Sequence, residues 1–536
     1  MDPRRVSPRI LIAAGVGVAC VASSFGAFAG TGKSVEEILG APRGGFAAYH
    51  PVTVTTNTAS AVPANLPVAY SGQRLTFKQT YINRKAAEPT LGVDRKGAIF
   101  TVAAAFDAIP GNPPKNEPKT LVMRSTDGGR SFQVKQPMIA GTNAHPVSTD
   151  PYIYVDPDYG RIFDIDLAGL NGSLLSYSDD QGATYTTVPL TSAFGANDHQ
   201  TLVTGVAPQG GQLQPTDPKF PKIVYYCVNQ VIVGSCARSI DGGRTFIQGN
   251  QTGYVAFNRG YIATLNNDHN DGICGSLHGH AVTDRVGTLY IPRGYCGRPY
   301  IAISKDEGTS FTDVQVSDTV GAAGQQASVA IDRQGHLYYV WFDNIHSLPY
   351  LSISRDGGMH WGTPMMIAPP GVHEVNFPSI DVGDPGKIVV TFPGTTFGDG
   401  AKPSTDSKRP WNFYVTMSTN ALAPHPLFTS NITNPVADPI ARGDCYDRCG
   451  RMYDFLDVVS APLDQGRVWA TQVDTCTALL DCNKAPVPGN HDDVIADETT
   501  GHMYGASADM QGVIVRQVSG PALRGKAKWI RGDTAR

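Results

Sequence analysis

The chain has 536 residues, 17% of them charged, and a formal net charge of −4. This small and balanced charge argues against a nucleic-acid partner, which requires a concentrated basic surface. The 58 glycines and 39 prolines favour a fold of short strands and many turns over one of long helices.

The N-terminal residues have the features of an export signal. Residues 1–9 include three arginines, an uncharged stretch follows, and Ala27-Phe28-Ala29 provides the small residues that precede signal-peptidase cleavage. We therefore expect residues 1–29 to be a cleaved signal peptide, in preference to an uncleaved anchor, and residues 30–67 to form a flexible lead-in. No later stretch has the ~20 apolar residues that span a bilayer. The expected product is a secreted, extracellular protein with no transmembrane segment.

The cysteines point to the same compartment. Once Cys20 is removed with the signal, eight of the nine remain, an even number that is typical of disulfides in an oxidising environment. Proximity along the chain favours four local pairs: Cys227 with Cys236, Cys274 with Cys296, Cys445 with Cys449, and Cys476 with Cys482.

Strand and turn patterns begin at residue 68, where the run 68–81 is expected to contribute a closing strand. Hairpins of the form Asp-x-x-Gly-x-apolar-aromatic then recur between short alternating runs. They occupy residues 94–100, 284–290 and 332–338, with looser copies around Gly160, Gly386, Gly466 and Gly501. The basic tail after Gly520 is expected to lie loose.

Five further segments share the pattern Ser-x-Asp-x-Gly-x-(Ser/Thr)-aromatic, with a histidine at the hydroxyl position of the fifth. Their aspartates are Asp127, Asp180, Asp241, Asp306 and Asp356. An aspartate and a hydroxyl residue can bind the backbone of a tight turn, and glycine supplies the positive φ that such a turn needs. We therefore expect each segment to join two outer strands, in a structural and not a catalytic role.

This pattern is the Asp box, or bacterial neuraminidase repeat. Over residues 88–361 the chain resembles the secreted, sialidase-like Asp-box β-propellers. The resemblance implies an all-β fold: a single β-propeller of four-stranded antiparallel blades over residues 68–520, followed by a C-terminal tail at 521–536. Counting hairpins predicts seven blades, with six or eight as alternatives.

The resemblance also implies a glycan-directed function, with glycoside hydrolysis as the activity if the protein is an enzyme. Sialidases hold the substrate carboxylate with arginines, the first of which lies in an Arg-Ile-Pro motif that opens the first blade. Here the corresponding residues are Ala87-Glu88-Pro89. Because an acidic side chain repels an anionic sugar, we expect a substrate other than sialic acid.

Polar residues just before each inner strand are expected to line the central funnel. The candidates for catalysis are Glu88, Asp150, Glu374 and Asp454, and those for substrate binding are His199, Gln200, His278, His280 and Arg293. His199 and His280 are also candidate ligands for a divalent metal, calcium or zinc.

Two other functions remain open at this point: a non-catalytic propeller that binds carbohydrate or protein, and a metal-dependent hydrolase or lyase that uses the funnel histidines. The expected partner is a glycan or cell-surface polysaccharide, and the expected oligomeric state is a monomer.

Overall fold

A computed structural model describes most of the chain between residues 68 and 525. The described ranges are 68–81, 86–105, 119–139, 141–142, 144–148, 150–168, 172–191, 197–229, 233–247, 254–255, 278–295, 297–322, 327–397, 410–434, 436, 439–442, 456–462, 464, 466–475, 496–497, 502–503 and 511–525. Every regular element in these ranges is a β-strand. Within the same ranges, the structure contains no helix with the length and apolar character to cross a membrane.

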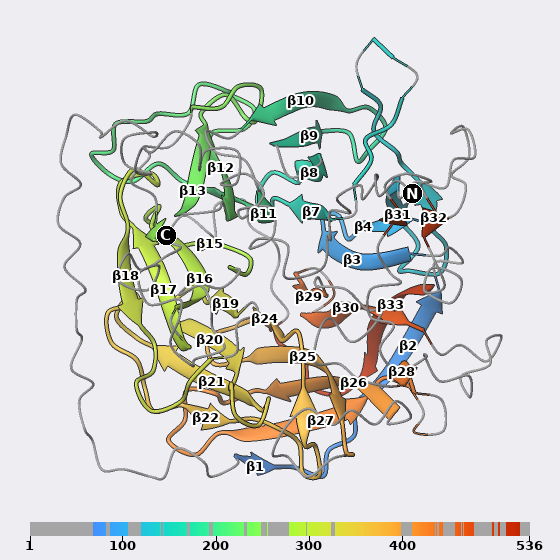
Figure 1. Ribbon diagram of the computed structural model, residues 1–536, viewed down its shortest axis with the longest axis vertical. Helices are drawn as coiled ribbons and strands as arrows, with labels where there is room; N and C mark the ends of the chain where they lie inside the picture. Colours follow the sequence, from blue (N-terminus) through green and yellow to red (C-terminus); the bar gives the residue numbers. More distant parts are fainter. Residues whose placement is uncertain are drawn as a thin grey trace, which may run out of the picture.

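The strands form seven four-stranded antiparallel blades around one axis, so the predicted propeller and its blade count are confirmed (Figure 1). From the axis outward, the first three blades are β3 (Ala86–Val93), β4 (Ile99–Ala105), β5 (Lys119–Ser125) and β6 (Gln133–Val134); β7 (Pro151–Val155), β8 (Ile162–Ala168), β9 (Gly172–Ser178) and β10 (Thr186–Thr191); and β11 (Asp198–Gly205), β12 (Ile223–Asn229), β13 (Val233–Ser239) and β14 (Tyr254–Val255).

The next three blades are β15 (Val282–Thr283), β16 (Leu289–Tyr295), β17 (Arg298–Ser304) and β18 (Thr312–Gln315); β19 (Ser328–Ile331), β20 (Leu337–Phe342), β21 (Pro349–Ser354) and β22 (Met365–Met366); and β24 (Ser379–Val382), β25 (Ile388–Thr395), β26 (Pro410–Ser418) and β27 (Leu427–Ile432). Blade 6 is extended by β23 (Glu374–Val375), β28 (Ala441–Arg442) and β1 (Ala69–Tyr70). Blade 7 consists of β29 (Val458–Ala461), β30 (Arg467–Asp474), β33 (Gln511–Ser519) and β2 (Thr76–Tyr81). The hairpin expected around Gly501 lies outside the blades, in the small sheet of β31 (Ala496–Asp497) and β32 (His502–Met503).

The ring is closed by residues from opposite ends of the described chain. Strand β2 pairs with β33 and forms the outer edge of blade 7, which confirms the closing strand expected at residues 68–81. Just before it, β1 pairs in parallel with β27 of blade 6. The first residues of the C-terminal tail are packed and not loose, because Leu523 is fully buried and Arg524 donates to the carbonyl of Val382.

The five repeated turns share one hydrogen-bond pattern. In the first, Ser125 Oγ donates to Asp127 Oδ1 over 2.8 Å and accepts from the N–H of Gly129 over 2.9 Å. Ser131 donates to the same carboxylate from both its backbone nitrogen and its hydroxyl. Asp180, Asp241, Asp306 and Asp356 repeat these bonds, with the His360 ring in place of the hydroxyl in the last. Each turn follows the third strand of its blade, as the sequence predicts.

Blade 6 has a related turn that the sequence pattern does not reveal. Ser418 Oγ donates to Asn420 Oδ1, and that oxygen accepts from the N–H of Leu427. Asparagine here takes the place of the aspartate, and the glycine is missing. Blade 7 cannot have such a turn, because its fourth strand comes from the N-terminal side of the chain.

The second glycine of a turn is packed against the preceding blade. A Cβ added at Gly129 would lie 2.7 Å from the Trp469 ring, and one at Gly358 would lie 2.8 Å from Ile303. Both glycines have positive φ, at 77° and 86°. The turns therefore need glycine both for backbone conformation and for contact between blades.

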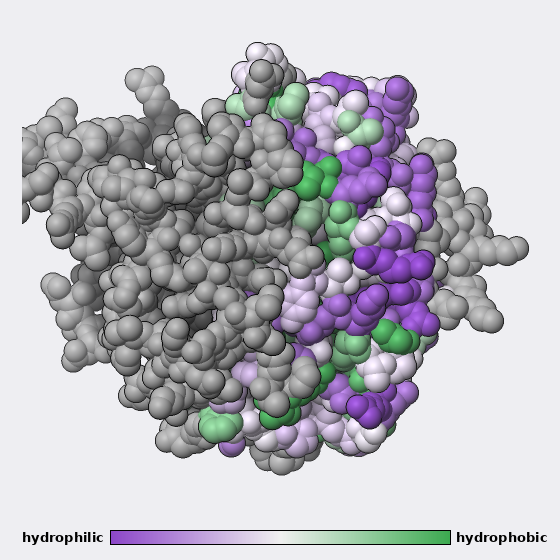
Figure 2. All heavy atoms as spheres, turned by 90° about the vertical axis from the view of Figure 1, so that its right-hand side faces the viewer, coloured by the Kyte–Doolittle hydropathy of each residue, from purple (hydrophilic) through white to green (hydrophobic). Residues whose placement is uncertain are grey.

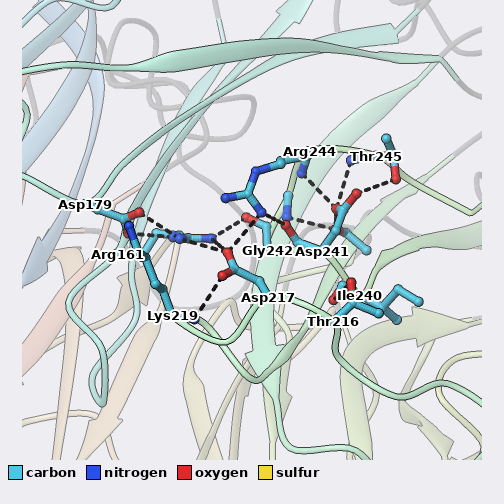
Figure 3. Close-up of polar contacts among 12 residues, drawn as sticks. Arg161, Asp179, Thr216, Asp217, Lys219, Ile240, Asp241, Gly242, Arg244 and Thr245 are labelled. Carbon is cyan, nitrogen blue, oxygen red and sulfur yellow. Dashed lines mark hydrogen bonds and ion pairs between the residues drawn. The ribbon is translucent and has the colours of Figure 1, made fainter.

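A buried ion network joins the outer parts of blades 2 and 3 (Figure 3). The Arg161 side chain has no exposed surface and contacts Asp179 at 2.7 Å and Asp217 at 3.2 Å. It also donates to the carbonyl of Gly242 in the third repeated turn, and Arg244 of that turn contacts Asp217 at 3.0 Å. Because a guanidinium has five N–H donors in a fixed plane, one arginine can satisfy several acceptors in two blades.

The apolar core lies between blades and not on the rim. Between blades 2 and 3, for example, Phe163, Leu175, Phe220 and Val224 are buried in one cluster. On the edge of the ring that Figure 2 shows, the described side chains are mostly hydrophilic, with small apolar patches. One predicted disulfide is confirmed, because Cys227 and Cys236 face each other across β12 and β13 and are bonded. The other three predicted pairs involve cysteines outside the described residues.

Two carboxyl groups are buried in the interface of blades 1 and 2. Asp164 and Asp166 of β8 have no exposed surface, and Thr120 of blade 1 donates to Asp166. Burial raises the pKa of Asp164 to about 8, while burial and the neighbouring Asp164 raise the pKa of Asp166. Ionising both of two adjacent buried carboxyls has a high free-energy cost, so this pair holds a proton near neutral pH.

Candidate functional site

Hydrogen bonds between inner strands define which positions are equivalent from blade to blade. In five blades, one backbone N–H of the inner strand donates to a side-chain oxygen of the preceding blade. These bonds run from Ile153 to Thr90 (3.0 Å), Ala281 to Thr201 (3.1 Å), Ile380 to Ser328 (3.3 Å), Ser460 to Asp381 (2.5 Å) and Leu91 to Asp457 (3.4 Å). The five donors set the relative register of the inner strands. The acceptors do not share one position, because Thr90 directly precedes the donor of its strand, Asp381 follows it and Asp457 lies three residues before it.

This register gives two sets of equivalent positions. The residue before each donor position forms the axial ring: Thr90, Tyr152, Thr201, His280, Ser328, Ser379 and Val459. The residue two positions earlier forms the upper ring: Glu88, Asp150, His199, His278, Phe377 and Asp457, in blades 1, 2, 3, 4, 6 and 7. The upper ring therefore borders the end of the propeller at which the inner strands begin.

Three members of the upper ring have unusual backbone conformations. Glu88, His199 and Phe377 have φ of 50°, 47° and 42°, in a region that few non-glycine residues adopt. In blades 1 and 3, one extra residue of the inner strand is accommodated at this point, so the pairing shifts register. Such bulges redirect side chains and are frequent next to functional sites.

In the axial ring, an aromatic side chain and an imidazole are in contact. The rings of Tyr152 and His280 have centroids 4.3 Å apart, although they come from blades 2 and 4. Thr201, the member between them, hydrogen-bonds the Tyr152 side chain. Burial raises the pKa of Tyr152 well above its usual value, so its hydroxyl remains protonated.

Next to this pair, the histidine half of the upper ring is formed by blades 3 and 4. His199 Nδ1 lies 3.3 Å from the carbonyl oxygen of His278, whose own Nδ1 lies 3.0 Å from the carbonyl oxygen of Gly279. Arg293 is paired with His278 through a β-bridge and is 1% exposed. Burial lowers the pKa of both His278 and His280 to about 3, so both rings are neutral at physiological pH.

The acidic half is formed by blades 7, 1 and 2, which place Asp457, Glu88 and Asp150 at successive positions of the upper ring. Asp457 accepts from its neighbour Val458 at 2.8 Å and from Leu91 of blade 1 at 3.4 Å. Burial raises its pKa to about 7, with a smaller contribution from the negative charge of Asp381. Asp457 is therefore partly protonated at neutral pH and can both donate and accept a proton.

Gln200 connects the two halves. Its side chain is fully buried, and Nε2 donates to the carbonyl of Asp150 in blade 2. Within the described part of the chain, its Oε1 accepts no hydrogen bond.

Several of the residues predicted from sequence thus lie together. His278 contacts His199 and interacts electrostatically with His280 and Arg293, while Gln200 joins Asp150 to the same region. Glu88 lies in the upper ring, in blade 1. Glu374 is in β23, which pairs with β25 directly ahead of the inner strand β24, so Glu374 lies on the inner side of blade 6. Asp454 lies outside the described residues.

Sequence reasoning missed Asp457 and Tyr152. Asp457 lies three residues after the candidate chosen in blade 7, and its place near the axis follows from its hydrogen bonds with Leu91 of blade 1 and Thr471 of blade 7. Tyr152 was not among the candidates, which in blade 2 were limited to Asp150. No group of three or more His, Cys, Asp or Glu side chains in the described ranges is arranged to hold a metal ion.

Comparisons with known proteins do not assign the chain to a family. No family model matches the sequence, and no curated protein does. Among solved structures, the chain is similar to the Hadza microbial sialidase Hz136 (15% identity, TM-score 0.37), covering 58% of this chain and 63% of the sialidase. It is also similar to the Penicillium chrysogenum alpha-L-arabinanase (13% identity, TM-score 0.38), covering 65% of this chain and 97% of the arabinanase. A third similar structure is streptogramin B lyase (10% identity, TM-score 0.41), covering 82% of this chain and 97% of the lyase.

The chain therefore spans less than two thirds of the length of that sialidase. The names of the three proteins indicate different activities, and at these identities and TM-scores the similarities carry no argument about chemistry. Function has to be argued from the site, because one fold supports many activities.

Proposed function

We propose that this chain is a secreted, glycan-directed propeller that binds its ligand at the end of the ring bordered by the upper ring. The observation that carries the proposal is the cluster of Tyr152, His280, His199 and His278, which three different blades bring to the axis. Neutral imidazoles each offer one donor and one acceptor, and a phenol adds both, which suits the hydroxyl groups of a sugar. The expected export signal and the Asp-box resemblance support the same proposal.

The upper ring also contains the groups that glycoside hydrolysis requires. A glycosidase uses one carboxylic acid to protonate the leaving oxygen and one carboxylate as base or nucleophile. Asp457 is suited to the first role because burial raises its pKa to about 7. Glu88 and Asp150 are the candidates for the second, and Glu374 and Asp454 remain further candidates from the sequence.

The binding proposal is tested with the mature protein on an array of oligosaccharides, followed by titration calorimetry of the best ligand. We expect His280→Ala to weaken binding at least tenfold because it removes the ring that contacts Tyr152. His425→Ala, at an exposed position in the connection between β26 and β27, is the matched control and should bind like wild type. If no glycan binds, or if both variants behave alike, the proposed function is wrong.

Catalysis is tested separately with aryl glycosides and polysaccharides. We expect Asp457→Asn to lower the rate by roughly 10²-fold or more with little effect on binding, since a general acid contributes 10²- to 10⁴-fold. Glycan binding without any sugar release would identify the protein as a non-catalytic carbohydrate-binding propeller.

A further inference from the structure

A short N-terminal segment, residues 68–71, lies on the outer edge of blade 6 and also contacts blade 5; we call it the clasp. Its strand β1 pairs with β27 at the rim of the ring (Figure 1). The N–H of Val68 donates to the carbonyl of Met366 over 3.2 Å, and the Tyr70 hydroxyl donates to the carbonyl of Ile367 over 2.7 Å. The clasp therefore holds the chain at the point where it leaves β22.

The connection that begins there, residues 367–378, runs from the outermost strand of blade 5 to the innermost strand of blade 6. It follows β22, includes β23 and ends at β24. Its rim end contains Ile367, and its axial end contains the candidate catalytic residue Glu374 and the upper-ring residue Phe377. One continuous segment thus joins the rim contact to the candidate site.

Apolar packing continues from the clasp along this connection. Val68 and Tyr70 pack against the buried cluster that contains Ile367, Val372 and Val375. These three residues of the connection are 0%, 7% and 1% exposed. The clasp is therefore packed against the same cluster that holds the axial end of the connection in place.

The axial end has a backbone conformation that needs support from its surroundings. Phe377 has a φ of 42°, and such conformations persist only where the surrounding structure over-determines them. Three N–H groups of this end donate to carbonyls of blades 5 and 6 over 2.8–3.0 Å: His373 to Thr395, Val375 to Ser347, and Asn376 to Pro393. Pro369 and Pro370 restrict the backbone between this end and Ile367, so the connection is stiff along its length.

We infer that the clasp positions Glu374 and Phe377 at the upper ring from the rim, with Tyr70 as the positioning residue. Because the connection is stiff and shares one apolar cluster with the clasp, loss of the contact at Ile367 loosens the axial end as well. The inference deepens the proposed function, and it rests on that function for its ligand-binding measurement alone.

The experiment compares two variants of the mature protein that each lose one hydroxyl group. Tyr70→Phe removes the hydrogen bond to the connection, whereas Thr76→Val, the matched control, removes a hydrogen bond of 2.6 Å to Ser519 in blade 7. Hydrogen–deuterium exchange is followed by mass spectrometry in a peptide covering residues 371–377. We expect exchange there to be about threefold faster or more in Tyr70→Phe, since one hydrogen bond corresponds to a factor of roughly 2 to 10 in an equilibrium constant. In Thr76→Val it should stay close to wild type.

A second measurement separates positioning from a general loss of stability. The best ligand from the glycan array is titrated by calorimetry, and thermal midpoints are recorded for the same samples. We expect Tyr70→Phe to bind about threefold more weakly or worse. Thr76→Val should bind like wild type, although the two variants should have similar thermal midpoints because each loses one hydrogen bond. Tyr70→Ala, which also removes the ring from the apolar cluster, should increase both effects.

Exchange that accelerates equally in both variants, or only in peptides of the clasp and β27, overturns the inference. An unchanged glycan affinity in Tyr70→Phe, despite faster exchange at residues 371–377, overturns it too, because the axial end would then move without affecting the site. If no glycan binds at all, the proposed function has failed, and the exchange comparison still decides whether the clasp holds the axial end.

Discussion

The buried carboxyl pair between blades 1 and 2 should make the stability of the ring depend on pH. The folded state raises the pKa of Asp164 from 3.8 to about 8, so it retains a proton that the unfolded chain releases above pH 4. The contribution of Asp164 to stability is therefore highest in acid and falls as the pH rises through this window, with a slope of up to about 1.4 kcal/mol per pH unit for one proton. Between pH 4 and 7 the loss is on the order of 4 kcal/mol.

Asp164→Asn removes the part of this dependence that comes from Asp164 and retains the shape of the side chain, while the buried Asp166 remains. Its amide can donate to Asp166, in place of the proton that the two carboxyls share. We expect the variant to be more stable than wild type at pH 7 and above, and similar to it near pH 4. Urea-unfolding midpoints measured in parallel from pH 4 to 9 check this difference.

Asp318→Asn, at an exposed position after β18, is the matched control and should follow the wild-type curve at every pH. Parallel curves for Asp164→Asn and wild type would refute the reasoning, because they would show that the pair binds no extra proton in the folded state. A variant less stable than wild type at pH 7 would refute it as well.

Three further predictions concern the ring itself. Arg161→Met should lower the free energy of unfolding by about 1.5–3 kcal/mol, measured by urea titration, because it removes the buried cation that contacts Asp217 and leaves that carboxylate with the half-exposed Arg244; a loss below about 1 kcal/mol contradicts this. Gly129→Ala should cost roughly 1–3 kcal/mol more than Gly97→Ala, since both glycines have positive φ but only at Gly129 does a methyl group meet Trp469; equal thermal midpoints would be inconsistent with contact between blades. A chain without β2 should unfold at a lower temperature and be cleaved within blade 7 by limited proteolysis, because β33 loses its outer partner; an unchanged digestion pattern would argue against closure by this strand.

Sequence reasoning predicts the features that depend on local chemistry. The Ser-x-Asp turns were found because their hydrogen bonds join residues no more than four positions apart, as between Asp127 and Ser131. The turn at Asn420 was missed since asparagine can accept the same bonds without matching the pattern. The pair Cys227 and Cys236 followed from proximity alone.

Features that depend on contact between blades were not predictable in the same way. Asp454 was chosen over Asp457 because the sequence does not show where the inner strand of blade 7 begins. That position depends on contact with the neighbouring blade, where the N–H of Leu91 donates to Asp457. The alternation around Asp164 and Asp166 is typical of a strand with one solvent-facing side. In a propeller both faces of a strand are covered by neighbouring blades, so the two aspartates are buried.

The pairing of β2 with β33 also has a consequence for the order in which the protein can fold. The contact between Thr76 and Ser519 joins residues 443 positions apart, so the ring cannot close until almost the whole chain has been synthesised. During that time β2 is made but its partner strand does not yet exist, and the edges of the first and last blades have no neighbours. Long-range pairing of this kind slows folding and exposes strand edges to association with other chains. A cell that makes this protein therefore has to keep the early blades apart from one another, in an unclosed chain, until the final strand emerges.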